Sequence, residues 1–316
     1  MRDDDTGAAG TILVTGASGT VGREVVRGLC AVGELPRAFV RDQTTARRRL
    51  GGTGPVDIVA GDLDRPETIA RALVGVDRVF LLTTQSRRQP QWERAVVEAA
   101  TRSGARSVVK VSVFRADEGS PLRVARQHRE AERALERTSL SWTVLRPVFF
   151  MQNLLAMVRG DVIATAAGDG RVAMVDARDV AAAAVAVLTG SGHDRRTYTL
   201  TGPEALTFDE VAAVVARRRG GDAPVRHVRV PPEAVRRALR EAGREEWFAE
   251  DMATLQSMLA DGYEDVRTGD VRAVTGRPPR ALDTFVADHP ALRPGASPPG
   301  VMEAAPSRPR SPGGHP

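Results

Sequence analysis

Residues 11–26 read TILVTGASGTVGREVV, and this stretch decides the fold. An apolar run leads into three glycines spaced G-x-x-G-x-x-G, and a helical pattern follows. In such a strand–turn–helix unit the first glycine permits a tight turn, the second lets a pyrophosphate approach the backbone, and the third lets the helix pack closely. We expect this turn to bind dinucleotide phosphates at the helix N-terminus, with an ordinary tight turn as the alternative. Its members are Gly16, Ala17, Ser18, Gly19, Thr20, Val21 and Gly22.

From residue 11 to about 150, apolar β-branched runs alternate with helical patterns. Continuous apolar strands separated by helices indicate a parallel sheet that is covered on both faces. The repeated strand–helix units predict an α/β fold of the Rossmann type, with a doubly wound parallel sheet. Asp64 is expected to cap the helix after the third strand. The expected strands are 11–16, 36–42, 56–63, 77–84, 107–114 and 141–147.

The regular alternation of strand and helix patterns ends after Pro147. Residues 148–160 look helical, short strands are expected within 195–204 and 225–231, and further helices follow. This pattern predicts a smaller, mainly helical substrate-binding region, and the Pro- and Gly-rich end predicts a disordered tail. The expected division is a flexible start at 1–10, a nucleotide-binding domain at 11–150, the substrate-binding region at 151–289 and the tail at 290–316.

The charge pattern argues against nucleic-acid binding although the sequence pI is about 10.4. The net charge is only +5, and acidic residues are interleaved with the basic ones. Of the 45 basic residues, Lys110 is the only lysine, and the arginine runs at 47–49 and 217–219 fall at expected helix ends, where cations suit the helix dipole. We therefore expect no nucleic-acid partner.

Composition also limits compartment and metal binding. Cys30 is the only cysteine, so no disulfide can form within one chain, which fits a reducing compartment. The acidic, glycine-rich residues 1–10 are unlike the basic start of a signal peptide. The most apolar stretch, 179–188, is shorter than the roughly 20 residues that span a bilayer. The five histidines are scattered. We expect a cytoplasmic protein without a membrane or metal partner.

The end of the second expected strand bears on the choice of dinucleotide. A carboxylate there binds the ribose 2′-hydroxyl of NAD, whereas an arginine accommodates the 2′-phosphate of NADP. Arg41 occupies this place and Asp42 follows it. We therefore expect NADP(H) to be preferred over NAD(H), with a solvated loop arginine as the alternative. Asp62 and Leu63 end the third expected strand, where Asp62 would lie near the adenine edge, cap a helix, or do both.

Four segments together resemble the NmrA-like branch of the atypical short-chain dehydrogenase/reductases. They are ILVTGASGTVG, GDLDRPETIARALVGVDRVFLLTT, LRPVFFMQNLL and YTLTGPEALTFDEVA, and the match covers residues 11 to about 287. This family includes NAD(P)H-dependent reductases of quinones and triphenylmethane dyes, and also cofactor-binding regulators without known turnover. The resemblance implies a Rossmann fold and cofactor contacts beyond the glycine turn. These are Leu82, Thr83 and Thr84 after the fourth strand, and Pro147, Val148 and Phe149 beside the nicotinamide.

The resemblance also implies where the substrate lies. Phe114, Phe150, Gln152 and Asn153 are expected to line its pocket. Gln152 and Asn153 could hold a substrate carbonyl or cap backbone groups. The family commonly has RPNFFMQN, so Val148 stands where the first asparagine would be, and we expect a polar pocket contact to be lost.

The catalytic pair Tyr-x-x-x-Lys of many short-chain dehydrogenases is absent. Val124 aligns with the tyrosine and His128 with the lysine. His128 shares a helical stripe with Val124, so it faces the core, either as a proton donor near the nicotinamide or as a satisfied core histidine. Lys110 lies inside an apolar strand and needs a partner, which we expect to be a salt bridge first and the cofactor second.

The sequence is compatible with two functions. The first is an NADPH-dependent reductase that transfers hydride to a small apolar conjugated acceptor such as a quinone, an enone or an aromatic polyketide-like compound. This chemistry depends more on positioning than on acid catalysis. The alternative is a non-catalytic NADP(H)-binding redox sensor that acts through a protein partner. The sequence leaves the oligomeric state open.

Overall fold

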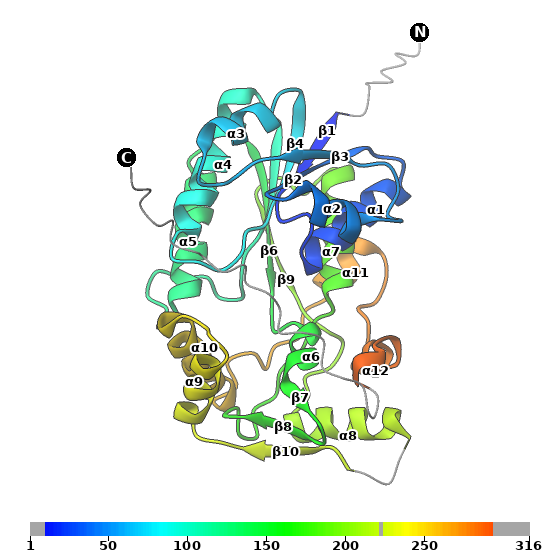
Figure 1. The fold of residues 1–316 in the computed structure, drawn as a ribbon, viewed down its shortest axis with the longest axis vertical. Helices are drawn as coiled ribbons and strands as arrows, with labels where there is room; N and C mark the ends of the chain where they lie inside the picture. The colour runs from blue at the N-terminus through cyan, green and yellow to red at the C-terminus, as the bar shows by residue number, and fades with distance from the viewer. Residues whose placement is uncertain (1–9, 221–223, 293–316) are drawn as a thin grey trace, which may run out of the picture.

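The computed structural model describes residues 10–220 and 224–292. The expected flexible start and disordered tail therefore lie almost wholly outside the described residues. A seven-stranded sheet forms the centre of the molecule, in the order β3-β2-β1-β4-β5-β6-β9, and all neighbouring strands are parallel (Figure 1). The doubly wound parallel sheet is confirmed. Its strands are β1 (Thr11–Val14), β2 (Pro36–Val40), β3 (Asp57–Ala60), β4 (Val76–Leu81), β5 (Ser107–Val111), β6 (Ser141–Pro147) and β9 (Arg196–Leu200).

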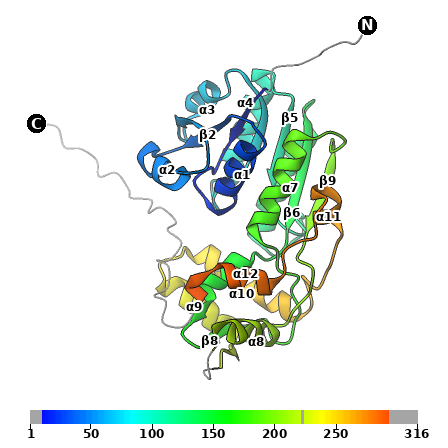
Figure 2. The same cartoon turned by 90° about the vertical axis from the view of Figure 1, so that its right-hand side faces the viewer.

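Helices cover both faces of this sheet, as Figures 1 and 2 show. In β1, Ile12 and Val14 face one core, whereas Leu13 faces the other, as the two-residue repeat of a strand requires. The Ile12 side is covered by α1 (Thr20–Ala31), α2 (Gln43–Leu50), α7 (Ala177–Thr189) and α11 (Asp270–Thr275). The Leu13 side is covered by α3 (Pro66–Ala72), α4 (Gln89–Ser103) and α5 (Arg123–Glu136).

The chain crosses the expected domain boundary near residue 150 more than once. β9 extends the main sheet beside β6, and α7 and α11 pack in the core on the Ile12 side. A strand was expected within 195–204, but not as part of this sheet. The carboxyl edge of the sheet is therefore built from both halves of the sequence.

A second core lies beyond the carboxyl ends of the main strands, at the bottom of Figure 1. Its small sheet has the order β10-β8-β7, with β7 (Val158–Arg159), β8 (Val162–Thr165) and β10 (Arg226–Arg229). Its helical elements are η1 (Met151–Asn153), α6 (Leu154–Met157), α8 (Phe208–Arg219), α9 (Pro232–Glu241), α10 (Glu246–Ala260), α12 (Leu282–Asp288) and η2 (Pro290–Leu292).

Two local expectations need correction. Residues 148–160 are not one helix, because β7 pairs with β8 as a hairpin that turns at Gly160, whose φ is 54°. Asp64 does not cap α3, because that helix begins at Pro66 and Arg65 is its N-cap. The Asp64 carboxylate instead accepts hydrogen bonds from Arg88 and Trp92.

Other expectations hold. The arginines at 47–49 and 217–219 lie in the last turns of α2 and α8. The apolar stretch 179–188 is the buried part of α7. Within the described ranges, no helix combines the length and the apolar character needed to cross a membrane.

Candidate functional site

The glycine turn joins the carboxyl end of β1 to the N-terminus of α1. Gly16 has φ of 62°, a left-handed conformation that favours glycine, and a Cβ there would lie 2.8 Å from the carbonyl oxygen of Leu82. A Cβ on Gly22 would lie 2.1 Å from the carbonyl oxygen of Gly16. These two glycines therefore allow the turn, α1 and the end of β4 to approach one another closely.

The same turn has the features that bind phosphate. Gly19 is the N-cap of α1 and offers no side chain to the first-turn N–H groups. Gly16, Gly19 and Thr20 are exposed, whereas Ala17 and Val21 are buried. β1 lies between β2 and β4, where the strand order reverses and nucleotides bind in such sheets. The residues present thus fit a dinucleotide pyrophosphate.

The side chains of Arg41 and Asp42 differ in whether they are free to bind a ligand. The Asp42 carboxylate caps α2, accepting from the N–H groups of Thr44 and Thr45 at 2.8 and 3.2 Å and from the Thr45 hydroxyl at 2.7 Å. The Thr45 hydroxyl hydrogen bond is the main cause that lowers the Asp42 pKa. Arg41 is exposed and has no ion pair or hydrogen bond within residues 10–220 and 224–292. Of the two, the guanidinium is the free group.

The candidate cofactor-binding residues at the ends of β3 and β4 differ in their burial and in their hydrogen-bond partners. Asp62 accepts from the N–H of Asp64, and Leu63 packs on the core beside α3 and α4. After β4, Leu82 is half-buried and Thr84 is exposed. The Thr83 hydroxyl is buried and donates to Glu93 at 2.8 Å. Thr83 therefore connects the edge where the cofactor is expected to a polar cluster beneath it.

Lys110 lies at the centre of that cluster. Its Nζ is 2.5 Å from Glu93 Oε2, and both side chains are fully buried. Nζ also lies 3.1 Å from His128 Nδ1. The expected salt bridge is confirmed. A direct cofactor contact does not fit a side chain with no exposed surface, so Lys110 can reach the edge only through Glu93 and Thr83.

His128 is buried, with 5% of its surface exposed. Burial, followed by the neighbouring Lys110, holds the His128 pKa well below its usual range. The ring is therefore neutral, and Nδ1 can accept from the Lys110 ammonium. As expected, His128 faces the core together with Val124. These observations favour a core histidine over an imidazolium proton donor.

The segment after β6 connects the two cores. Pro147 and Val148 are buried, and the Val148 N–H donates to Leu200. Phe149 packs edge-on against Phe208 of the second core, with ring centroids 6.1 Å apart. Phe150 packs against the core on the α1 side of the sheet. These consecutive residues thus fix how the second core meets the carboxyl edge of the main sheet.

Gln152 and Asn153 differ in how far they are engaged. Gln152 donates to Asp176 Oδ1 at 2.9 Å and accepts from the Ala177 N–H at 3.0 Å. Both ends of its amide are thus used at the N-terminus of α7, as the capping alternative predicted. Asn153 is half-buried, and its side-chain amide makes no hydrogen bond in the part of the chain that the structure describes. Asn153 remains the predicted substrate contact of the two.

Tyr263 reaches the end of β5 from the other half of the sequence. Its ring lies edge-on to Phe114 at 5.6 Å, and the Arg115 guanidinium lies 5.0 Å from the Phe114 ring and 5.1 Å from the Tyr263 ring. Tyr263 also packs against the cluster that contains Val124. A tyrosine from another element therefore packs on the cluster that contains Val124, the position that aligns with the catalytic tyrosine of short-chain dehydrogenases.

Glu264 follows directly and is buried, with 5% of its surface exposed. Its Oε2 accepts from the Phe149 N–H at 3.0 Å. Burial raises the Glu264 pKa to about 7, which the Phe149 hydrogen bond offsets only in part. Sequence reasoning missed this carboxyl, since no local pattern marks it.

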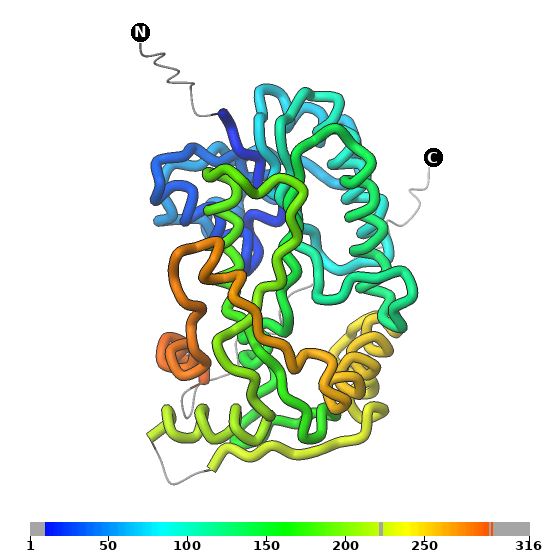
Figure 3. The backbone as a smooth tube through the Cα atoms, turned by 180° about the vertical axis from the view of Figure 1, so that it is seen from behind, coloured from blue at the N-terminus to red at the C-terminus, as the bar shows by residue number. Residues whose placement is uncertain are grey.

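Asp251 of α10 fastens the second core to α5. Leu122, the N-cap of α5, makes no side-chain cap hydrogen bond, and Asp251 instead accepts from the N–H groups of Arg123 and Val124 at 3.0 and 2.7 Å. Figure 3 shows α9 and α10 beside this end of α5. A capping carboxylate from a different element fixes the helix that carries His128.

The NmrA-like family model matches residues 8–282 of the chain. The chain belongs to the NmrA-like family. The NAD(P)H azoreductase of Xenophilus azovorans is 38% identical over 285 residues, which are 89% of this chain and 98% of that protein. The (4-alkanoyl-5-oxo-2,5-dihydrofuran-3-yl)methyl phosphate reductase of Streptomyces griseus is 37% identical over 294 residues, which are 88% of this chain and 97% of that protein.

A solved structure agrees with this assignment. The NADPH-dependent quinone oxidoreductase of Escherichia coli, complexed with NADPH, matches with a TM-score of 0.78 at 26% identity and covers 88% of this chain and 99% of that one. The family expected from the four sequence segments is confirmed. This NmrA-like protein is an oxidoreductase of the atypical short-chain dehydrogenase type.

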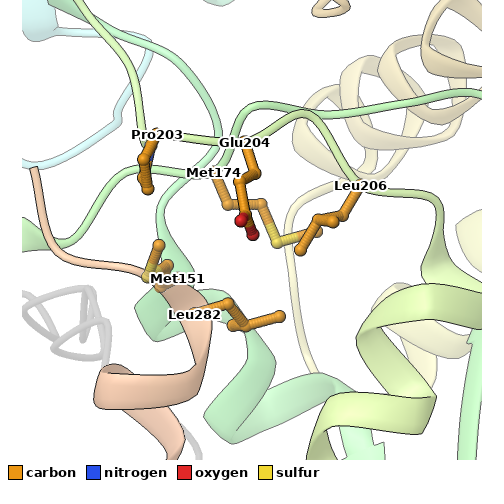
Figure 4. Close-up of a pocket in the computed structure, with 6 residues that line it drawn as sticks. All are labelled: Met151, Met174, Pro203, Glu204, Leu206 and Leu282. Carbon is orange, nitrogen blue, oxygen red and sulfur yellow. The ribbon is translucent and has the colours of Figure 1, made fainter.

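One small hollow of this NmrA-like protein lies beside the segment after β6, where Met151 stands between Phe150 and Gln152. Figure 4 shows its side chains, which converge from η1, from α12, from the segment before α7 and from the segment between β9 and α8. Met151 belongs to the segment from Phe150 to Asn153 that is expected to line the substrate pocket, whereas Phe114, Phe150, Gln152 and Asn153 do not line this hollow. The lining residues are Met151, Met174, Pro203, Glu204, Leu206 and Leu282.

Proposed function

We propose that this protein reduces a small, apolar, conjugated acceptor with hydride from NADPH. The carrying observation is that the azo, dihydrofuranone and quinone reductases that the chain resembles align over nearly their whole length. Their acceptors share a conjugated system that can take up two electrons. Bound NADPH would supply the hydride. The chain would supply an apolar, aromatic surface on which the acceptor is positioned.

The residues at the sheet edge suit this task. Phe114 and Tyr263 form an aromatic pair after β5, and Phe150 follows β6. Flat rings stack favourably on such side chains. The sensor alternative is less favoured, because the similar proteins named above are reductases and the chain spans almost all of each.

The test of this function is turnover. Purified protein with NADPH should oxidise the nucleotide when a naphthoquinone, a butenolide, an azo dye or a triarylmethane dye is added. Absorbance of NADPH measures the rate, and samples without acceptor give the background oxidation by oxygen. Tight NADPH binding without turnover of any of these acceptors would instead favour the sensor.

We further propose that Arg41 selects NADPH. Replacing Arg41 with alanine should weaken NADPH binding by roughly tenfold to a hundredfold, because charged hydrogen bonds to the 2′-phosphate contribute about 1.5–3 kcal/mol. NADH binding should change little, since NADH has no such phosphate. Fluorescence titration of both nucleotides measures the two Kd values. Arg49→Ala, an exposed arginine in the last turn of α2, is the control. Equal losses for both nucleotides would contradict this role.

A further inference from the structure

Glu264 differs from the other buried carboxylates because, among the described residues, it has neither a cation nor a second hydrogen bond beside it. Glu93 pairs with Lys110, Glu132 with Arg146, Asp176 with Arg178, and Asp179 with Arg280. Asp251 binds two N–H groups at the start of α5. Within residues 10–220 and 224–292, the Glu264 carboxyl has a single hydrogen-bond partner, the Phe149 N–H. A buried carboxyl without a cation is favoured in its protonated form.

The hydrogen bond also orients the carboxyl. Because Oε2 accepts from Phe149, the proton of the acid belongs on Oε1, which makes no hydrogen bond among the described residues. Phe149 comes two residues after the end of β6. Ligands of parallel α/β sheets bind at the carboxyl ends of the strands. Glu264 therefore holds a carboxylic O–H at the edge where the acceptor is expected.

The surroundings of Glu264 are aromatic. Tyr263, its neighbour in the chain, packs on Phe114, which follows β5. The charged or titratable groups that act on Tyr263 are Glu264, Arg115, Arg146 and Asp117. Tyr263 is neutral at physiological pH, since burial and then Glu264 raise its pKa above the usual value. Burial raises the pKa of Glu264 to about 7, so its carboxyl exchanges a proton near neutral pH.

We propose that Glu264 is the catalytic acid that protonates the acceptor as hydride arrives. This inference rests on the proposed function. With an enone, hydride forms a C–H bond at the β-carbon, the C=C electrons shift to the carbonyl oxygen, and that oxygen takes the proton from Glu264. NADPH becomes NADP⁺, the enol product rearranges to the ketone, and the Glu264 carboxylate regains a proton from water. The acid supplies the step that the missing tyrosine performs in other short-chain dehydrogenases.

A matched pair of acceptors tests this role. An enone needs a proton, whereas a cationic triarylmethane dye takes hydride at its central carbon and becomes neutral without one. Glu264→Gln keeps an oxygen for the Phe149 N–H but has no acid proton. We expect its kcat with the enone to fall by about a hundredfold, within the usual range for general acids. The loss with the dye should be at least roughly tenfold smaller.

The pH dependence gives a second readout. Because the acid acts only when protonated, wild-type kcat with the enone should be highest below pH 7 and fall as the pH rises through the Glu264 pKa of about 7. Glu264→Gln should lose this decline, whereas Tyr263→Phe should keep it. In the protein without nucleotide, the infrared carbonyl band of a protonated carboxyl should disappear over the same range, and Glu264→Gln should lack that change.

Glu250→Gln on α10 is the control, because Glu250 is exposed. NADPH affinity, measured by fluorescence, confirms that each variant is folded. Equal losses with enone and dye, or a pH decline that persists in Glu264→Gln, would overturn the inference and leave the reductase intact. A wild-type protein that reduces none of the acceptors would instead overturn the proposed function, and the inference with it.

Discussion

Replacing Lys110 with methionine should lower the free energy of unfolding by about 3–5 kcal/mol, the usual cost of leaving one partner of a buried ion pair alone. Lys110 and Glu93 are both fully buried, with Nζ 2.5 Å from Oε2. The variant would leave the Glu93 carboxylate without its cation and His128 without the ammonium that faces Nδ1. Denaturation in urea measures the loss, without NADPH, since a bound nucleotide would stabilise both proteins.

Two further variants separate the buried pair from charge in general. Arg27→Met removes an exposed ion pair with Glu24, whose atoms are 2.6 Å apart, and should cost less than about 1 kcal/mol. The double variant Lys110→Met, Glu93→Gln removes both charges and should recover part of the loss. A Lys110→Met protein as stable as Arg27→Met would show that the buried pair contributes little.

The contacts of Lys110 and Glu93 also connect the core of the sheet to the edge where the cofactor is expected. Glu93 binds Lys110 through one oxygen and the Thr83 hydroxyl through the other. Thr83 follows β4, beside the glycine turn. The core pair therefore fixes the segment after β4, which is expected to pass the cofactor. We expect Lys110→Met to weaken NADPH binding as well as stability.

The sheet could be predicted because buried parallel strands are continuous apolar runs. β1 and β5 stand out in this way, and both were located within a few residues of their true ends. β9 was found as a strand but not placed in the main sheet. It reads RTYTL, and its first residues, Arg196 and Thr197, are exposed at the sheet edge. A polar edge strand lacks the signal that marks the buried ones.

The candidate site was less accessible to prediction, because its key contacts join distant parts of the chain. Glu264 lies 115 residues from Phe149, and Asp251 lies 127 residues from Val124. No local pattern marks either carboxylate. The helical stripe correctly placed His128 in the core, but only the contact with Lys110 and the depth of burial indicate a neutral ring. Gln152 likewise reveals its capping role only through Asp176 and Ala177.

Replacing Gly22 with alanine should reduce NADPH affinity by more than about tenfold, or 1.4 kcal/mol. The added Cβ would lie 2.1 Å from the carbonyl oxygen of Gly16 and 2.7 Å from its carbonyl carbon. Backbone cannot yield as a flexible side chain can, so α1 and the turn must separate. The N–H groups at the start of α1 would then move from the pyrophosphate. Fluorescence titration with NADPH measures this loss.

Substitutions at two other glycines test whether the effect of Gly22→Ala comes from the glycine turn. A Cβ on Gly269 would meet nothing within 4 Å, so Gly269→Ala should bind NADPH like wild type. A Cβ on exposed Gly19 would come no closer than 3.2 Å to the protein. This contact with the carbonyl oxygen of Gly16 is tight but much looser than that of Gly22. Gly19→Ala should therefore weaken nucleotide binding and cost less unfolding free energy than Gly22→Ala, which should lose about 1–3 kcal/mol, as overpacked sites do. Unchanged NADPH affinity in both Gly19→Ala and Gly22→Ala would mean that the turn only joins a strand to a helix.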